Sequence, residues 1–407
     1  MASYKLLSES NVSETTSRKQ SDRLSQRLSP RAKSDVTVVT PKTRRERKQF
    51  LNLPWQIYRD CPYWIPPLRR NQEELVGYRK HPFYDNAAGQ SFLAYRDNRP
   101  VGRILAIDNK IHNEAFADDP RGFIGFFESI DDQQVADALF DAARGWLRER
   151  GLTNLRGPAN PSINYEWGLL IDPFDMPPTF MLTYNHEYYI KLWENIGFEK
   201  VQDMFSYFGH RDYIPTLEEK VTFIAEEASR RLNVKLRQID KKRFNQDVQE
   251  FLNIYNQALI GTWGFIPLSD AEVVHMSKSL QQLIEPQLTL VAEIDGKAVG
   301  MIFGMLDYNP RIKEIDGRLF PFGFLKLMTR RREIKRVRFI STNVLPEYQR
   351  WGVGVILTRF MLEPALDFGI EEAEFSWVLE TNYLSRKSLE RGGLSLEKTH
   401  RVYDFNA

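Results

Sequence analysis

The same order of predicted secondary-structure elements occurs twice along the 407-residue chain, and this repeat restricts the fold more than any single motif. In the first half, Ser91–Arg96 and Val101–Ile107 alternate apolar and polar residues on either side of a turn, which predicts a hairpin. In the second half, Leu288–Ile294 and Ala298–Leu306 show the same pattern around a turn that contains glycine.

A strand followed by a helix comes next in each half. Gly122–Phe127 is a predicted strand, and Asp132–Arg150 carries apolar residues at three- and four-residue spacing, as an amphipathic helix does. Val337–Leu345 and Gly354–Phe368 repeat this pair in the second half. Each half then closes with a helix and a strand. These are Tyr188–Ile196 with Val201–Phe208, and Leu384–Arg391 with Thr399–Phe405.

Strands that alternate with helices in this way predict an α/β class with a mixed sheet. We interpret the chain as two homologous domains, residues 49–212 and 213–407, after a tail of residues 1–48. The repeated elements are not evenly offset, so each half carries an insertion, at Gly157–Asn185 and at Asp307–Lys335. Ordinary α/β alternation without duplication remains the alternative.

The tail is strongly basic. It holds twelve Lys and Arg against five acids, a net +7, whereas the whole chain has a net charge of +2. Its apolar residues are too sparse to bury, so we expect it to be disordered. A basic arm for nucleic acid or anionic lipid is one interpretation and a solvated tail is the other. Nucleic acid is the less favoured partner, because no aromatic residues interleave the charges.

Composition bears on whether the protein spans a membrane, forms disulfides or binds zinc. No run of 18 apolar residues occurs, so no membrane-spanning helix is predicted. The single cysteine, Cys61, cannot form an internal disulfide, and the six histidines show no zinc-ligand spacing. We expect a cytoplasmic protein without a metal.

One motif has the chemistry of phosphate binding. The predicted strand Val337–Leu345 leads into a loop and then a helix, with Gly352 and Gly354 at the junction. Glycine lets backbone N–H groups approach a ligand closely, and a helix N-terminus favours an anion. Gln349 and Arg350 add side-chain donors. The spacing fits neither the dinucleotide-binding fingerprint nor the P-loop.

These residues resemble the GNAT acyltransferase superfamily. The loop Gln349–Gly354 is similar to that family's acyl-CoA pyrophosphate loop, and Asn343–Tyr348 is similar to the end of its fourth strand. Glu374–Asn382 resembles its fifth strand and Leu384–Leu394 its last helix. The resemblance covers Gln246–Phe405 well and the first half more faintly.

The resemblance implies that the fourth and fifth strands splay apart and that acetyl-CoA or a longer acyl-CoA lies between them as cosubstrate. Its expected contacts are the backbone near Val344 and Leu345, the side chain of Asn382, and the loop residues Gln349, Arg350, Gly352, Val353 and Gly354. The first half has Asp131-Asp132-Gln133 at the loop position, and carboxylates there would repel a pyrophosphate. Only the second domain is therefore expected to bind CoA.

Acyl transfer to an amine needs a base and a proton donor for the leaving thiolate. Glu380, at the end of the fifth strand, is the candidate base, and Glu128, at the equivalent strand end of the first half, is a weaker candidate; a solvated glutamate is the alternative. The family's tyrosine acid in the last helix is replaced by Leu389. Tyr403 on the final strand is the candidate substitute, unless it is an ordinary core tyrosine.

The second insertion suggests the acceptor. Leu319–Met328 is apolar and aromatic, and Thr329–Arg338 is heavily basic, which is typical of a contact with an anionic membrane. The alternative is an apolar segment that packs under the first domain. Tandem proteins resembling this one are associated with N-acylation of long-chain amines in bacterial sphingolipid synthesis.

The sequence therefore predicts an acyl-CoA-dependent N-acyltransferase whose acceptor is an amine, long-chain or lipid-like, at the inner face of a membrane. An inactive CoA-sensing or protein-interaction module is the alternative, because the helix tyrosine is missing. A nucleic-acid-binding regulator acting through the tail is a third hypothesis.

Overall fold

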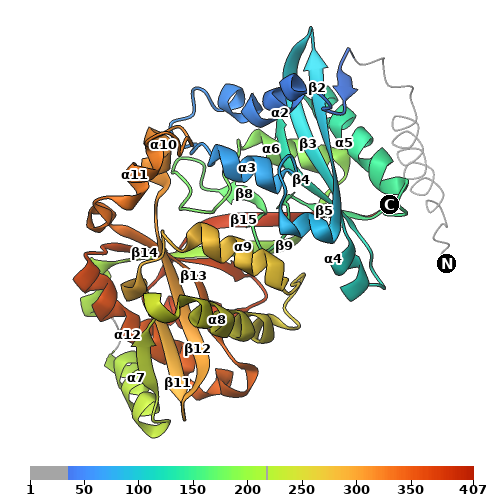
Figure 1. Ribbon diagram of the computed structural model, residues 1–407. Coiled ribbons are helices and arrows are strands. Elements are labelled where there is room, and N and C mark those ends of the chain that lie inside the picture. Colours follow the sequence, from blue (N-terminus) through green and yellow to red (C-terminus); the bar gives the residue numbers. More distant parts are fainter. Residues whose placement is uncertain (1–34, 217–218) are drawn as a thin grey trace, which may run out of the picture.

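The computed structural model describes residues 35–216 and 219–407, and it contains the predicted repeat (Figure 1). The first run of elements is β1 (Thr37–Val39), α2 (Arg44–Ile57), α3 (Arg69–Leu75), β2 (Ala87–Arg96), β3 (Arg99–Asn109), β4 (Gly122–Ser129), α5 (Gln133–Arg148), β5 (Leu155–Gly157), α6 (Tyr188–Ile196) and β9 (Glu199–His210). The second run is β10 (Lys235–Gln238), α8 (Phe244–Leu259), α9 (Asp270–Leu280), β11 (Thr289–Ile294), β12 (Lys297–Leu306), β13 (Arg336–Val344), α12 (Val353–Phe368), β14 (Glu372–Leu379), α13 (Tyr383–Arg391) and β15 (Ser395–Phe405). The predicted α/β class is confirmed.

Shorter elements lie between and beside these runs. They are α4 (Lys110–Ala115), β6 (Ala159–Asn160), β7 (Glu166–Trp167), β8 (Leu169–Asp172), α7 (Glu219–Arg231), α10 (Asn309–Glu314) and α11 (Gly323–Met328). The insertion of the first half contains β6 to β8, and that of the second half contains α10 and α11.

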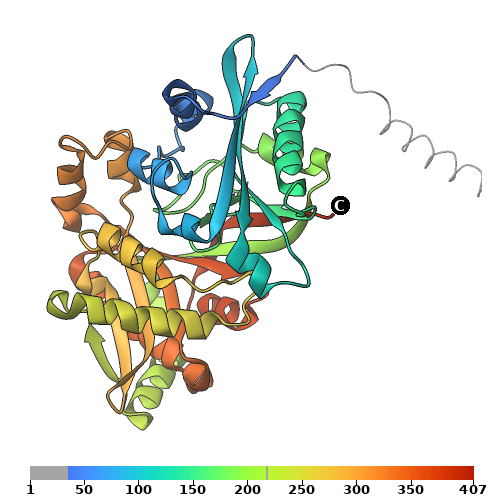
Figure 2. The ribbon, with the colours of Figure 1, turned by 45° about the vertical axis from the view of Figure 1, so that its right-hand side comes forward.

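One continuous sheet runs through both halves, in the order β1-β2-β3-β4-β5-β15-β9-β14-β13-β12-β11-β10 (Figure 2). Neighbouring strands are antiparallel except for two parallel pairs, β4 with β5 and β13 with β14. These two pairs occupy equivalent places in the two halves.

The two halves exchange their last strands. β9 belongs to the first half by sequence, but it pairs with β14 of the second half. β15 ends the second half, but it pairs with β5 of the first half and with β9. A cut between residues 212 and 213 therefore separates the chain into its repeats, although each repeat completes the sheet of the other.

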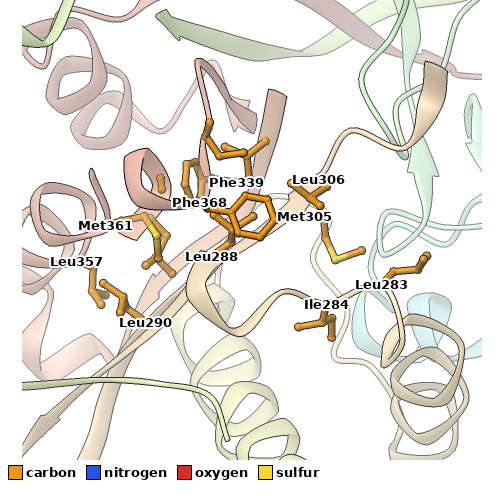
Figure 3. Packing of buried hydrophobic residues seen from close by; sticks show 14 of the residues in the cluster. Leu283, Ile284, Leu288, Leu290, Met305, Leu306, Phe339, Leu357, Met361 and Phe368 are labelled. Atoms are coloured by element: carbon orange, nitrogen blue, oxygen red, sulfur yellow. The ribbon is translucent and has the colours of Figure 1, made fainter. Parts of the chain in front are cut away.

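Helices cover both faces of the second-half sheet. Leu290 and Ala292 of β11 pack in the cluster that includes α12, whereas Val291 packs with Ile254 of α8. Successive side chains of a strand point to opposite faces, so α12 and α8 lie on opposite sides. On the α12 side, Phe339 and Phe368 are among the packed residues shown in Figure 3.

The tail prediction is wrong over its last part. Thr37–Val39 pairs with β2, and α2 starts with a capping box in which Thr43 and Glu46 bond each other's backbone N–H. Val36 and Val38 pack against the core of the first half, so these apolar residues are not too sparse to bury. Residues 1–34 of the predicted tail lie outside the described residues.

Candidate functional site

β13 and β14 separate in the middle of the second half. They pair in parallel from Arg336 and Glu372 to Phe339 and Phe375, and no further pair is formed between them. Beyond this point β13 stays on β12, while β14 continues on β9. The splayed pair expected from the GNAT resemblance is therefore present.

A cavity of about 1010 Å³ occupies this region. It is lined by Phe251 and Tyr255 of α8, on one face of the sheet, and by Leu362 of α12 and Leu389 of α13, on the side of α12. A cavity lined from both faces passes through the gap between the two strands. Such a passage lets two reactants approach one point from opposite sides of the sheet.

The N-terminus of α12 opens into the cavity. Gly352, its N-cap residue, has φ +83°, a left-handed conformation that glycine adopts without strain, and no side chain caps the helix. A Cβ on Gly354 would meet only Val344, at 3.9 Å. Both glycines line the cavity. The first N–H groups of α12 are thus accessible to an anion.

The equivalent helix start in the first half is closed. Asp132 caps α5 by accepting from the backbone N–H groups of Gln134 and Val135, at 2.9 and 3.3 Å. Arg96 pairs with the same carboxylate at 2.6 Å. These bonds lower the pKa of Asp132, with the Arg96 hydrogen bond as the largest cause.

The gap between β4 and β5 is filled as well. A Cβ on Gly125 would lie 1.7 Å from the carbonyl oxygen of Ala159, so β6 packs directly on β4. The backbone N–H of Phe126 donates to the Asn160 side chain at 2.6 Å. The insertion of the first half therefore occupies the space that is open in the second half.

The predicted cosubstrate residues of the strand end have different roles. The Leu345 N–H donates to the Val299 carbonyl of β12, at 2.9 Å, and is not available to a ligand. Backbone groups alternate in direction along a strand, so those of Val344 point to the gap. The Val344 carbonyl accepts from the Gln349 side chain at 3.1 Å.

The remaining predicted contacts surround the α12 N-terminus. Arg350 is exposed in the short 3-10 turn Pro346–Trp351 that precedes Gly352, and it does not line the cavity. The Val353 side chain is fully buried, so only its backbone can face a ligand. Asn382 lines the cavity, but its side chain caps α13 by accepting from the Ser385 N–H at 3.1 Å.

The α8 side of the gap has a polar wall that the sequence analysis did not identify. Arg338 donates to the Ser376 hydroxyl at 2.8 Å and to the carbonyls of Phe180 and Met181, and the residue is 3% exposed. Ser376 in turn bonds Glu374 at 2.9 Å. Arg338 and Ser376 of this network line the cavity at the point where the strands separate.

Two further polar residues lie on β13 past that point. The Asn343 amide donates to the Ser341 hydroxyl at 2.6 Å, and both residues line the cavity. Asn343 pairs with Met301, which packs with α8, so its side chain is on the α8 face. The α8 side is polar near the gap and aromatic farther out.

Comparison with known proteins gives the family. No family model matches the chain. The chain is 35% identical over 383 residues to a protein named Bacterial ceramide synthase from Caulobacter vibrioides, covering 91% of this chain and 97% of that protein. It is 32% identical over 376 residues to Protein YghO from Escherichia coli, covering 90% and 94%. The chain belongs to the family of these two proteins.

The fold is similar to that of solved GNAT proteins. A tandem GNAT protein from the clavulanic acid biosynthesis pathway superposes with a TM-score of 0.53 at 11% identity, covering 91% of this chain and 98% of that chain. The predicted GNAT-like fold is confirmed. The chain thus combines a GNAT-like, acyltransferase-type fold with membership of the family that includes Bacterial ceramide synthase.

The structure does not bring the predicted catalytic residues into the cavity. The Glu380 carboxylate pairs with Lys200 at 2.8 Å and does not line the cavity. Tyr403 is fully buried beside Trp193 in the first-half core, with its hydroxyl on Glu194 at 3.3 Å. Because β15 crosses into the sheet of the first half, Tyr403 is a core tyrosine.

The predicted position of Glu128, at the strand end equivalent to that of Glu380, is wrong. It pairs with Arg103 as Asn343 pairs with Met301, so it corresponds to the end of β13 and not to Glu380. Its carboxylate accepts from Tyr189 at 2.7 Å inside the core, and burial raises its pKa.

Another carboxylate near the cavity was missed. Glu166 of β7 is next to Tyr165, which lines the cavity, and its side chain has one long hydrogen bond, 3.5 Å from Asn160. Burial raises its pKa to about 7, and Arg338 is among the charges that act on it. A carboxyl group with this pKa can exchange protons at neutral pH.

We expect Glu166→Gln to stabilise the protein at neutral and alkaline pH but not near pH 4.5. The folded pKa lies above the unfolded value, so the wild type loses stability as pH rises from about 4.5 through about 7. Glutamine removes this loss, which we expect to be about 3 kcal/mol at pH 8 and near zero at pH 4.5. Urea unfolding at both pH values measures it. An equal difference at both would show that Glu166 does not titrate in this range.

Proposed function

We propose that the protein is an acyl-CoA-dependent N-acyltransferase that uses its second half to bind acyl-CoA. The observation that carries this proposal is the difference between the halves. In the second half, an uncapped helix start opens into a cavity through the sheet, whereas in the first half Asp132 and β6 close the same places. An enzyme with one active half needs only one such opening.

The residues at the opening fit the parts of a CoA thioester. The first N–H groups of α12 can bind a diphosphate, and exposed Arg350 lies beside them. The Val344 backbone faces the gap and can bond a pantetheine amide once Gln349 releases its carbonyl. Asn382 lines the same cavity.

In the proposed reaction, the acceptor nitrogen forms a bond to the carbonyl carbon, the carbon–sulfur bond breaks, and CoA leaves as the thiol. The amine must lose a proton and the thiolate must gain one. We propose that the acceptor enters from the α8 side, where Ser341, Asn343 and Ser376 supply hydrogen-bonding groups.

A long-chain amine is the acceptor class that we propose. The α8 side of the cavity is lined by apolar and aromatic side chains that include Phe251, Trp263 and Trp377. Such a surface suits a hydrocarbon chain better than a polar amine. The related protein named Bacterial ceramide synthase has 35% identity to this chain, which supports a lipid-like acceptor.

Release of free thiol tests the proposal. We expect acyl-CoA and a long-chain base together to release thiol at a rate at least tenfold above acyl-CoA alone. A short polar amine at equal concentration serves as the matched acceptor. The alternative, an inactive CoA-binding module, is motivated by Leu389 in place of the helix tyrosine. That module would show a higher melting temperature with acyl-CoA but no thiol release with any amine.

A further inference from the structure

The second-half insertion, with α10 and α11, lies at the outer edge of the molecule (Figure 1) and carries exposed aromatic side chains. Phe320, Phe322, Phe324 and Leu325 are 70%, 73%, 40% and 46% exposed. We call these four residues the wedge. Large apolar side chains grouped on one surface are typical of an interaction site.

The segment below the wedge is fixed to the first half. Asp316 bonds the Trp55 indole and pairs with Arg69 at 2.7 Å. Gly317 lies so close to the Pro67 carbonyl that a Cβ would come within 2.1 Å. The insertion therefore packs against the first half through its base, whereas the wedge itself does not pack there and faces outward.

The surface around the wedge is basic. Residues 307–335 contain eight Lys and Arg against four Asp and Glu, a net +4. The side chains of Arg318 and Arg330 are 65% and 79% exposed. Two members of the predicted basic run do not contribute, because Arg336 and Arg338 point inward to Glu374 and Ser376. An apolar group surrounded by cations is complementary to a layer of anionic lipid headgroups over hydrocarbon.

A second cavity lies beside the main one and reaches the end of α11. It has a volume of about 420 Å³ and is lined by Met328 at the end of α11. Ile239, Phe244 and Ile284 line this cavity as well as the main cavity, so the two are separated by one layer of apolar side chains. The insertion that carries the wedge therefore contributes Met328 to a cavity next to the main one, whose lining also includes Lys241, Gln281 and Gln282.

We propose that the wedge inserts into an anionic lipid bilayer and holds the protein on the membrane surface. The rings supply apolar contact, and Arg318, Arg330 and their basic neighbours supply attraction to the headgroups. The docking does not depend on the proposed acyl transfer, although it would bring a lipid-like acceptor to the cavity.

Vesicle flotation of the full chain tests the proposal. We expect wild-type protein to float with vesicles of phosphatidylglycerol and phosphatidylcholine, and to float weakly with phosphatidylcholine alone. Changing Phe320, Phe322 and Phe324 together to Ser should lower the bound fraction about tenfold. Changing Arg318 and Arg330 to Gln should weaken binding and reduce its sensitivity to salt.

Phe223→Ser is the matched control, because Phe223 of α7 is 66% exposed and lies outside the wedge. The control should float as the wild type does, and all variants should keep the wild-type melting temperature because the changed residues are exposed. Equal flotation of the triple variant and the wild type would overturn the proposal. So would binding that is lost equally in the control, or self-association of the wild type that the triple variant abolishes without any effect of lipid.

Discussion

Gly354→Glu should abolish binding of acyl-CoA while leaving the protein as stable as before. Gly354 is the second residue of α12 and its φ is not left-handed, so a side chain there is not strained. The nearest atom to its Cβ is 3.9 Å away. Glutamate at this position favours the helix itself, because a carboxylate near the N-terminus stabilises it. The same carboxylate would repel a diphosphate and weaken acyl-CoA binding by about a hundredfold or more.

Two matched variants serve as controls. One separates the effect of the added charge from that of the added volume, and the other tests whether the effect is specific to the start of α12. Gly354→Gln adds a similar volume without charge, so it should retain more affinity than Gly354→Glu. Gln134 holds the corresponding second position of α5, and Gln134→Glu should leave the affinity unchanged because that helix start is closed by Asp132. Titration calorimetry with acyl-CoA and thermal unfolding measure these outcomes. Full affinity in Gly354→Glu would place the cosubstrate elsewhere and remove the basis of the proposed function.

Local patterns predict much of this fold. The predicted strand Val337–Leu345 and helix Gly354–Phe368 match β13 and α12 within one residue at each end, because alternation and helical spacing are both strong there. The helices α2 and α3, and α8 and α9, were not recognised as part of the repeat. The first turn of α2 carries Arg44, Arg45 and Arg47, so its start was read as part of the basic tail.

The exchange of strands could not be predicted in this way. Val201–Phe208 and Thr399–Phe405 are both strands that follow a helix, and nothing local indicates whether each pairs within its own half. Pairing partners are fixed by contacts far apart in the sequence. The prediction that Tyr403 belongs to the second-half site requires β15 to stay in its own half. Because β15 pairs with β5 of the first half, Tyr403 lies in the core of the first half.

The basic run near β13 shows a second limit of prediction from sequence, which is the direction in which each side chain points. Thr329–Arg338 is continuous in sequence, but β13 begins within it, and alternate residues of a strand point to opposite faces. Arg336 and Arg338 lie opposite Glu372 and Glu374 in the parallel pair. In the sequence, the only indication of a buried ionic network is that one predicted strand carries arginines and the next predicted strand carries glutamates.

Glu374→Gln should cause the largest loss of stability among single changes to this network. Glu374 is fully buried and accepts from Arg336 at 2.9 Å and from Lys398 at 3.3 Å. It also bonds the Thr179 hydroxyl, which joins the first-half insertion to β14. Glutamine keeps the shape but leaves buried cations with less compensation, which typically costs about 3–5 kcal/mol of unfolding free energy.

The pH dependence of this loss identifies its cause. Burial alone would raise the pKa of Glu374, but Lys398, Arg336 and the other donors outweigh it and lower the pKa from 4.5 to about 2. The ionised form therefore adds stability above pH 4.5, and this contribution is lost as pH falls toward 2. We expect the difference between wild type and Glu374→Gln to stay constant from pH 7 to 5 and to fall by about half near pH 3.

Urea unfolding across this range measures the difference, with Glu390→Gln as the control. Glu390 is the partner of Lys387 at the surface, at 2.7 Å, and we expect its change to leave the unfolding midpoint where it is at every pH. A constant difference down to pH 3 would mean that lost packing, and not lost charge, weakens the Glu374 variant. A difference in unfolding free energy that falls with pH would show that the charge of Glu374 stabilises the junction of the two halves. Arg338 and Ser376, at the gap, belong to the same network.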